Sequence, residues 1–242
     1  RYFLGNYSSR TKKMRKNKSH FLLMTVAAIY FAACSEDSNS WSAKDVCPED
    51  GVNVYGMANR GTFIDERDGQ EYRYTTIGDQ VWMAQNLNYA TEYSACYDND
   101  ELNCELWGRF YSLLEDGQPS GPMNDAMVDS ICPTGWHVPG EQEWTRRIAS
   151  IGKYNDHETA KRLKSLELWT HEYSGGNGTD ECGFRALPGG DQAPSKSEYM
   201  YQYAGFWTST MKTPGLAYTI FVGATIFETA SSYRNSIRCI KN

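Results

Sequence analysis

The sequence predicts an α+β domain built from short antiparallel strands, two or three helices and long loops. The predicted elements run in the order strands, helices, a long irregular segment and strands again, unlike the strand–helix alternation of a parallel sheet. Six cysteines follow Cys34, and an even number in an exported chain indicates disulfides. With 17 Tyr, seven Trp and 21 Gly, the composition favours an aromatic, loop-rich secreted domain over a helical bundle.

The first predicted unit is a meander of three strands. Residues 62–66 form the first strand, Asp68-Gly69 supplies a tight turn, and side chains alternate over 72–76 on the returning strand. A second turn leads into a strand over 81–83. These signals place a small antiparallel sheet near the start of the domain.

Three helices are predicted in the middle of the chain. The clearest covers about 141–151, where Trp144, Ile148 and Ile151 recur at helical spacing and Gly152 ends the run. Others are expected over 105–115 and from Asp156 to Leu166.

The last third of the chain is predicted to be loops followed by strands. The segment from Ser174 to Ser195 is rich in turn residues. Strands are expected after it over 205–210, 217–222, 225–229 and 236–240, with the second and third paired.

The N-terminal segment has the pattern of an export signal. Residues 1–33 hold seven of the 24 Lys and Arg and no acid, and an apolar run covers 21–34. We interpret residues 1–33 as upstream sequence plus a lipoprotein signal that starts at Met14. Phe31-Ala32-Ala33-Cys34 resembles a bacterial lipobox, so Cys34 is the expected lipidation site. The alternative is an ordinary cut near Ala33. A polar tether over 34–45 then precedes a domain over 46–242.

Removal of the signal makes the remaining chain strongly acidic. It leaves 17 Lys and Arg against 30 Asp and Glu, a net charge of −13 rather than −6. This charge argues against nucleic acid as a partner and against adhesion of the protein surface to an anionic membrane. Membrane attachment is therefore expected through the lipid alone.

Six segments carry a resemblance to a known family. They occur in the order DERDGQEYRYTTIGDQVWMAQNLNY, CYDNDELNCELWGRFYS, ICPTGWHVPGEQEW, CGFRALPGG, GFWTST and SIRCIKN. Together they resemble the Fibrobacter succinogenes major paralogous domain, a family of exported bacterial proteins that are often lipoproteins. The resemblance runs from about Gly61 to Asn242. It implies a C-type-lectin-like fold, distantly similar to formylglycine-generating enzymes.

The resemblance also implies how the cysteines pair. It implies a local bridge between Cys96 and Cys104, and a bridge from Cys132 to Cys239 on the last strand. Cys47 and Cys182 are the two cysteines that remain, and the sequence leaves their pairing open. Formylglycine-generating enzymes need two C-terminal cysteines close in sequence, and this chain has only Cys182 and Cys239 there, far apart. The chemistry of those enzymes is therefore not expected.

No metal or cofactor site is predicted with a complete ligand set. The acidic loop from Asp98 to Glu101 offers oxygen ligands for calcium, but Leu102 interrupts the spacing of an EF-hand, and a solvated loop is the simpler interpretation. His137, His157 and His171 lack ligand spacing, so catalytic zinc is not expected.

Aromatic side chains give the predicted ligand site. Tyr199, Tyr201 and Tyr203 recur at period two, so on a strand they would share one face, and Trp207 follows on the next strand. Flat aromatic rings stack on the apolar faces of sugars. Trp207 also fits a core position.

The amide-rich segment Gly78 to Ala90 is interpreted as a determinant of the fold. Trp82, Met83 and Leu87 are predicted to anchor the core. Four amide side chains are predicted to hydrogen-bond the bend, namely Gln80, Gln85, Asn86 and Asn88.

From the sequence we expect a lipid-anchored protein of the cell envelope, at the outer membrane or cell surface. Its expected role is that of a non-catalytic binding or adhesion module, with polysaccharide as the first partner and another envelope protein as the second. An enzyme of unassigned type and a structural surface-coat protein remain as alternatives.

Overall fold

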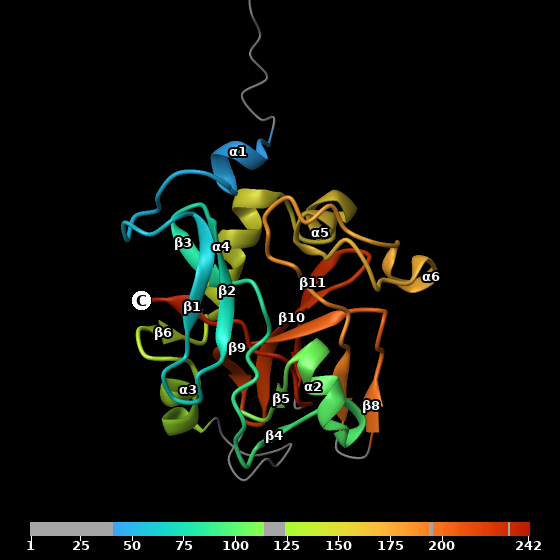
Figure 1. The fold of residues 1–242 in the computed structure, drawn as a ribbon. Helices are drawn as coiled ribbons and strands as arrows, with labels where there is room; N and C mark the ends of the chain where they lie inside the picture. The colour runs from blue at the N-terminus through green and yellow to red at the C-terminus, as the bar shows by residue number, and fades with distance from the viewer. Residues whose placement is uncertain (1–40, 114–123, 194–195, 232) are drawn as a thin grey trace, which may run out of the picture. The chain divides into compact units, whose positions relative to one another are not determined.

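The computed structural model describes residues 41–113, 124–193, 196–231 and 233–242 (Figure 1). The expected export signal, Met14, Cys34 and most of the expected tether fall outside these ranges. In the described part, short antiparallel sheets and helices alternate irregularly along the chain, which confirms the α+β class.

The larger sheet has five strands and joins both ends of the folded unit. Strands β1 (Arg60–Ile64), β2 (Glu71–Ile77) and β3 (Gln80–Met83) form the predicted meander. The last strand, β12 (Ile240–Lys241), lies between β3 and β6 (Trp136–His137), with Ile240 opposite Trp82. The C-terminal residues are therefore interior to a sheet that begins with the first strands.

A second sheet has three antiparallel strands in the order β11-β10-β9. These are β9 (Ala204–Thr213), β10 (Leu216–Val222) and β11 (Ile226–Ser231). Two small hairpin-like pairs complete the strands: β4 (Ser94–Ala95) with β5 (Phe110–Tyr111), and β7 (Asp191–Ala193) with β8 (Lys196–Glu198).

Two of the predicted helices form where local signals placed them. Helix α4 (Glu141–Ile151) starts where the Glu143 carboxylate accepts a hydrogen bond from the Gly140 backbone N–H at 2.8 Å. Helix α5 (His157–Leu163) is capped by Asp156, which accepts from the Thr159 N–H at 2.7 Å. Helix α4 packs against α5, β9 and β10.

The helix predicted over 105–115 has different bounds. Helix α2 (Glu101–Trp107) starts four residues earlier, because Asp100 caps it by accepting from the Leu102 N–H. It ends at Gly108, which has a φ of 71°, and a Cβ there would lie 2.7 Å from the Asn86 Cβ. The chain after this glycine forms β5, so Phe110, which was expected on the helix, belongs to a strand.

The remaining helices are short. They are α1 (Ala43–Val46), the 3₁₀ turn η1 (Tyr97–Asn99), α3 (Asp125–Ile131) and α6 (His171–Ser174). Trp41 and Val46 pack against the core, and the Arg162 guanidinium lies 3.8 Å from the centre of the Trp41 ring. Folded structure therefore starts within the segment expected to be a tether. None of the helices within the described ranges has the length and apolarity needed to span a membrane.

The main core joins α4 to both sheets through aromatic rings. Trp82 of β3 lies 4.5 Å from Trp144 of α4, measured between ring centroids. Trp144 in turn stacks on Phe206 of β9 and meets Phe184 edge-on. These contacts confirm Trp82 as a core anchor, and Met83 and Leu87 are likewise fully buried.

Candidate ligand-binding surface

The three tyrosines lie in a turn and not on a strand. Residues 199–203 connect β8 to β9, and the backbone at Tyr199 and Tyr201 is left-handed, with φ of 63° and 68°. The expectation that period two places the three rings on one strand face is therefore wrong. Left-handed backbone at a bulky residue is unfavourable by about 1–2 kcal/mol, and such strain collects at ligand sites.

Tyr199 and Tyr203 come together with two phenylalanines that sequence reasoning missed. We call this set of four rings the aromatic row, comprising Tyr199, Tyr203, Phe221 and Phe227. Successive ring centroids are 5.0, 4.7 and 5.3 Å apart. Both ends are open to solvent, with Tyr199 46% and Phe227 39% exposed. The row is a surface on which flat apolar groups can stack.

Tyr201 lies apart from this row. Its side chain is 42% exposed and meets Trp107 of α2 edge-on at 5.7 Å. Its backbone N–H donates to the Pro188 carbonyl at 2.7 Å. Tyr201 therefore joins the tyrosine turn to helix α2.

Asp191 is a buried carboxylate beside the aromatic row. It is 3% exposed, and its Oδ2 accepts a hydrogen bond from the Tyr203 hydroxyl at 3.2 Å. Its Oδ1 is buried and has no hydrogen-bond partner in the described part of the chain. Burial raises the pKa of Asp191 to about 6. A carboxylate kept in such surroundings is costly and marks a candidate functional position.

Trp207 is a core residue and offers no surface to a ligand. Its side chain is fully buried, and its Nε1–H donates to the Tyr111 carbonyl at 2.6 Å. The ligand-binding assignment of Trp207 is therefore wrong, and the core interpretation holds.

The acidic loop uses two of its acids for structure. Asp100 caps α2, and the Glu101 carboxylate pairs with Arg109 at 2.6 Å. One group of possible metal ligands occurs among the described residues, namely Cys96, Glu101 and Cys104, but both cysteines are in a disulfide. Asp100 and Glu101 thus help to fix the conformation of the loop.

Each histidine lies at a different place in the fold. His137 lies between the Asn242 amide oxygen and the Glu143 carboxylate, at 2.6 Å from Nδ1 and 3.2 Å from Nε2. The hydrogen bond to Glu143 is the main reason that the pKa of His137 is raised. His157 contacts the Ala224 carbonyl, and His171 opens α6. The structure does not bring the three together.

The amide-rich segment holds its bend largely as predicted. Asn86 donates to the carbonyl of Trp107 and to the Ser236 hydroxyl, and accepts from Arg238. Gln85 accepts from the Arg73 N–H, and Gln80 from Arg147. Asn88 differs, because its side-chain oxygen is buried without a partner in the described ranges.

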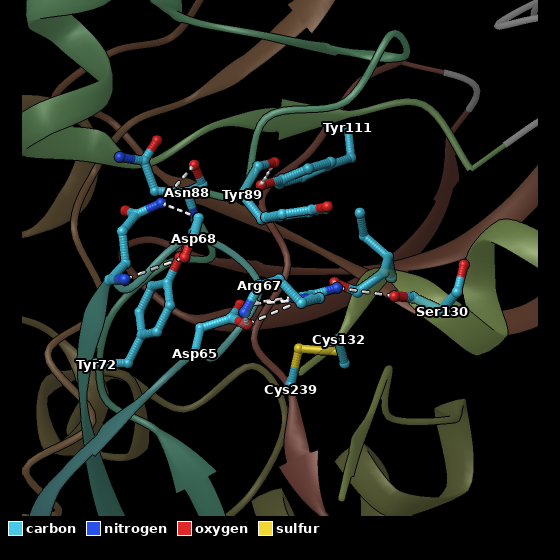
Figure 2. Close-up of polar contacts among 12 residues, drawn as sticks. Asp65, Arg67, Asp68, Tyr72, Asn88, Tyr89, Tyr111, Ser130, Cys132 and Cys239 are labelled. Atoms are coloured by element: carbon cyan, nitrogen blue, oxygen red, sulfur yellow. Dashed lines mark hydrogen bonds and ion pairs between the residues drawn. A yellow bond between two sulfur atoms is a disulfide. The ribbon is translucent and has the colours of Figure 1, made fainter. Parts of the chain in front are cut away.

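The turn of the first hairpin also contacts this bend, because the Gln70 side-chain amide donates to the Asn88 carbonyl at 3.2 Å. Figure 2 shows Arg67 in a two-pronged contact with Asp65, while it also donates to the Ser130 carbonyl at the end of α3. The Tyr72 hydroxyl accepts from the Asn88 N–H at 3.0 Å. These hydrogen bonds and the ion pair fix the conformation of the hairpin and the bend.

A polar pocket of about 320 Å³ opens between β2, the bend and α2. Its wall includes Arg73, Arg185, Glu71, Glu105 and Gln85. Burial and then the nearby charge of Arg185 lower the pKa of Arg73. The pocket was missed in the sequence because its two arginines are far apart along the chain.

The six cysteines of the domain form three disulfides. Cys96–Cys104 and Cys132–Cys239 are the bridges implied by the resemblance, and Cys47–Cys182 is the pairing that the sequence left open. Cys182 and Cys239 are thus both engaged, so neither is a free thiol for copper.

Comparisons with known proteins identify the chain at the level of the family. Neither the curated proteins nor the solved structures gave a match. The family model described as the Fibrobacter succinogenes major domain matches residues 75–241. That range contains the aromatic row, Asn86 and two of the three disulfides in full. The chain belongs to the Fibrobacter succinogenes major domain family.

Proposed function

We propose that the protein is a non-catalytic binding module of the cell envelope that takes polysaccharide on its aromatic row. The observation that carries the proposal is the left-handed turn that presents Tyr199 half-exposed with its ring stacked on Tyr203. Such a ring offers an apolar face of the kind that sugar rings cover.

Two further features support this assignment. Asp191 holds the Tyr203 hydroxyl beneath the row, so the ring of Tyr203 is fixed before a ligand arrives. Gly190, with a φ of 71°, allows β7 to pass against the backbone of Glu198, where a Cβ would clash. The turn that holds Tyr199 therefore packs against a segment that contacts it through Asp191 and that requires glycine at position 190.

The fold expected from the resemblance is consistent with a binding role. In the proposed C-type-lectin-like arrangement, the last strand returns to the first sheet and a disulfide ties it there. Here β12 lies between β3 and β6, and Cys239 is bridged to Cys132. The proposed partner, polysaccharide, would bind without calcium, because the assigned surface is aromatic. Another envelope protein is the second candidate partner.

The proposed location is the outer membrane or cell surface, through a lipid on Cys34. The proposal rests on the lipobox-like Phe31-Ala32-Ala33-Cys34 after the basic and apolar segments. Palmitate labelling of wild type and Cys34→Ala in cells tests it. Labelling of wild type alone is expected, and equal labelling of both would overturn the anchor.

The ligand proposal is tested with a glycan array and pull-downs on insoluble polysaccharides. Tyr199→Ala should reduce binding at least tenfold, because it removes the exposed face of the row. Tyr55→Ala is the matched control, since Tyr55 is 41% exposed and outside the row. Retention of full affinity by Tyr199→Ala, or no polysaccharide binding by wild type, would contradict the proposal.

A further inference from the structure

Arg73 and Arg185 bring two guanidinium groups to the wall of the same polar pocket. Arg73 lies on β2 and Arg185 follows the buried Phe184. Besides burial, the charge of Arg185 is close enough to Arg73 to lower the pKa of Arg73. Two cations in one hollow repel each other unless a negative group lies between them.

Asp180 supplies some negative charge, since its Coulombic effect opposes the lowering of the Arg73 pKa. The guanidinium of Arg73 makes no hydrogen bond or ion pair in the described ranges, and Arg185 has only a distant contact with Glu167, at 3.9 Å. Glu71 and Glu105 line the pocket, yet no ion pair joins either of them to these arginines among the described residues. Guanidinium groups without a close ion pair are available to hold a carboxylate.

The rest of the wall favours a ligand that also carries hydroxyl groups. Glu71 and Glu105 contribute carboxylate acceptors to this wall. Simple inorganic anions at neutral pH have few or no protons to donate to these acceptors. Sugar hydroxyls donate readily, so the pocket suits a sugar that bears a carboxylate.

The pocket and the tyrosine turn are connected through α2. Leu187 lines the pocket, and the next residue, Pro188, accepts the hydrogen bond from Tyr201. Glu105 and Leu106 of α2 face the pocket, while Trp107 of the same helix packs on Tyr201. A volume of about 320 Å³ is near the lower end for small-ligand sites and fits roughly one sugar residue.

We infer that this pocket binds the carboxylate of a uronic acid residue in an acidic polysaccharide, through Arg73 and Arg185. The inference deepens the proposed function, on which it rests for the class of partner. It names a site separate from the aromatic row, so each can fail alone. In this arrangement the two arginines take the carboxylate, and the acidic side chains accept from the hydroxyls.

Isothermal titration of the folded domain with trigalacturonic acid, and with neutral galactotriose, tests the inference. Wild type should bind the acidic trisaccharide at least tenfold more tightly, and 0.5 M NaCl should remove most of that difference. Arg73→Gln and Arg185→Gln should each weaken binding of the acid about tenfold or more and leave the neutral sugar unchanged. Arg73→Lys keeps the positive charge but loses the two-pronged donor geometry of the guanidinium. Its affinity for the acidic trisaccharide should lie between those of wild type and Arg73→Gln.

Arg146→Gln is the control, because Arg146 is exposed on α4 and does not line the pocket. Thermal unfolding of every variant verifies that it is folded. Equal affinity of wild type for the two trisaccharides would overturn the inference, as would unchanged affinity in both glutamine variants. Tyr199→Ala separates the two proposals. If Tyr199→Ala weakens both trisaccharides and neither arginine variant weakens the acid, the aromatic row is supported and the pocket inference is overturned. If the arginine variants weaken the acid and Tyr199→Ala changes neither trisaccharide, the pocket is supported and the aromatic-row proposal fails.

Discussion

The Nε of Arg238 donates to the Oδ1 of Asn86 at 2.6 Å, between two buried residues 152 positions apart. The same guanidinium donates to the carbonyls of Met83 and Phe184, and lies 4.5 Å from the centre of the Phe184 ring. Neutral acceptors therefore hold a fully buried cation. Burial lowers the pKa of Arg238 to about 9, so the group is still charged at neutral pH.

Replacement of Asn86 by alanine should destabilise the domain by about 2–4 kcal/mol, since it leaves a buried charge and the Trp107 carbonyl short of partners. Urea denaturation measures the change. Gln142→Ala, at an exposed position of α4, should stay within about 0.5 kcal/mol of wild type. A loss for Asn86→Ala as small as that of the control would show that the bond contributes little.

Trp82→Ala should cost about 3–5 kcal/mol of unfolding free energy, because it removes a ring packed against Trp144 and Phe184. The measurement is again urea denaturation. Leu166→Ala at an exposed site is the control, with little change expected. A loss below about 1 kcal/mol would contradict the role of Trp82 as a core anchor.

Local signals made part of this fold predictable. Helix α4 and the β1–β2 hairpin follow from apolar spacing, caps and a turn, each contained within a few residues. The tyrosine turn was mispredicted because period two says nothing about the left-handed backbone at Tyr199 and Tyr201. Spacing along one segment carries no information about such a reversal.

The sites required information from distant parts of the chain. Asp191 meets Tyr203 only because β7 passes below the turn, and Phe227 reaches the row through Phe221 on the neighbouring strand. Arg73 and Arg185 share a pocket although more than 100 residues separate them. Tertiary contacts of this kind leave no periodic pattern in a single sequence.

Asp191→Asn should remove a pH dependence from the stability. The pKa of Asp191 is raised by burial from 3.8 to about 6, so the native state holds this proton more tightly than the unfolded chain. Wild type should therefore lose stability as pH rises from about 4 through 6, by about 2 kcal/mol from this group. The variant should not show that part of the loss.

The measurement is a series of denaturation curves from pH 4 to 7.5. Asp129→Asn, at an exposed position of α3, should follow wild type. A constant difference between wild type and Asp191→Asn at every pH would exclude the carboxyl as the source.

His137→Gln should destabilise the domain more at acidic pH than at basic pH. The Glu143 hydrogen bond raises the pKa of His137 above 6.5, so its contribution is complete below that pH and is lost as pH rises through the folded pKa. Because the side chain is partly exposed, the effect should stay below about 1 kcal/mol. Thermal unfolding at pH 5.5 and 8.5 should show a larger gap at pH 5.5. Equal gaps would rule out the ion pair, and His171→Gln serves as the control.

Mass mapping of a non-reduced digest should recover the peptide pairs Cys47–Cys182, Cys96–Cys104 and Cys132–Cys239. The reduced digest of the same sample is the control. A peptide that joins Cys132 to Cys182 would contradict the pairing.

The position of β12 between β3 and β6 has a consequence for how the chain acquires its structure. The first sheet gains an interior strand only when residues near the end of the chain are available. Pairing Ile240 with Trp82 also closes a loop of most of the domain, which makes folding slow compared with a fold of local contacts. A chain that stops before Ile240 would leave the edges of β3 and β6 unpaired. The domain should therefore become resistant to proteases only when β12 is present, and a truncation before Ile240 should leave it sensitive to them.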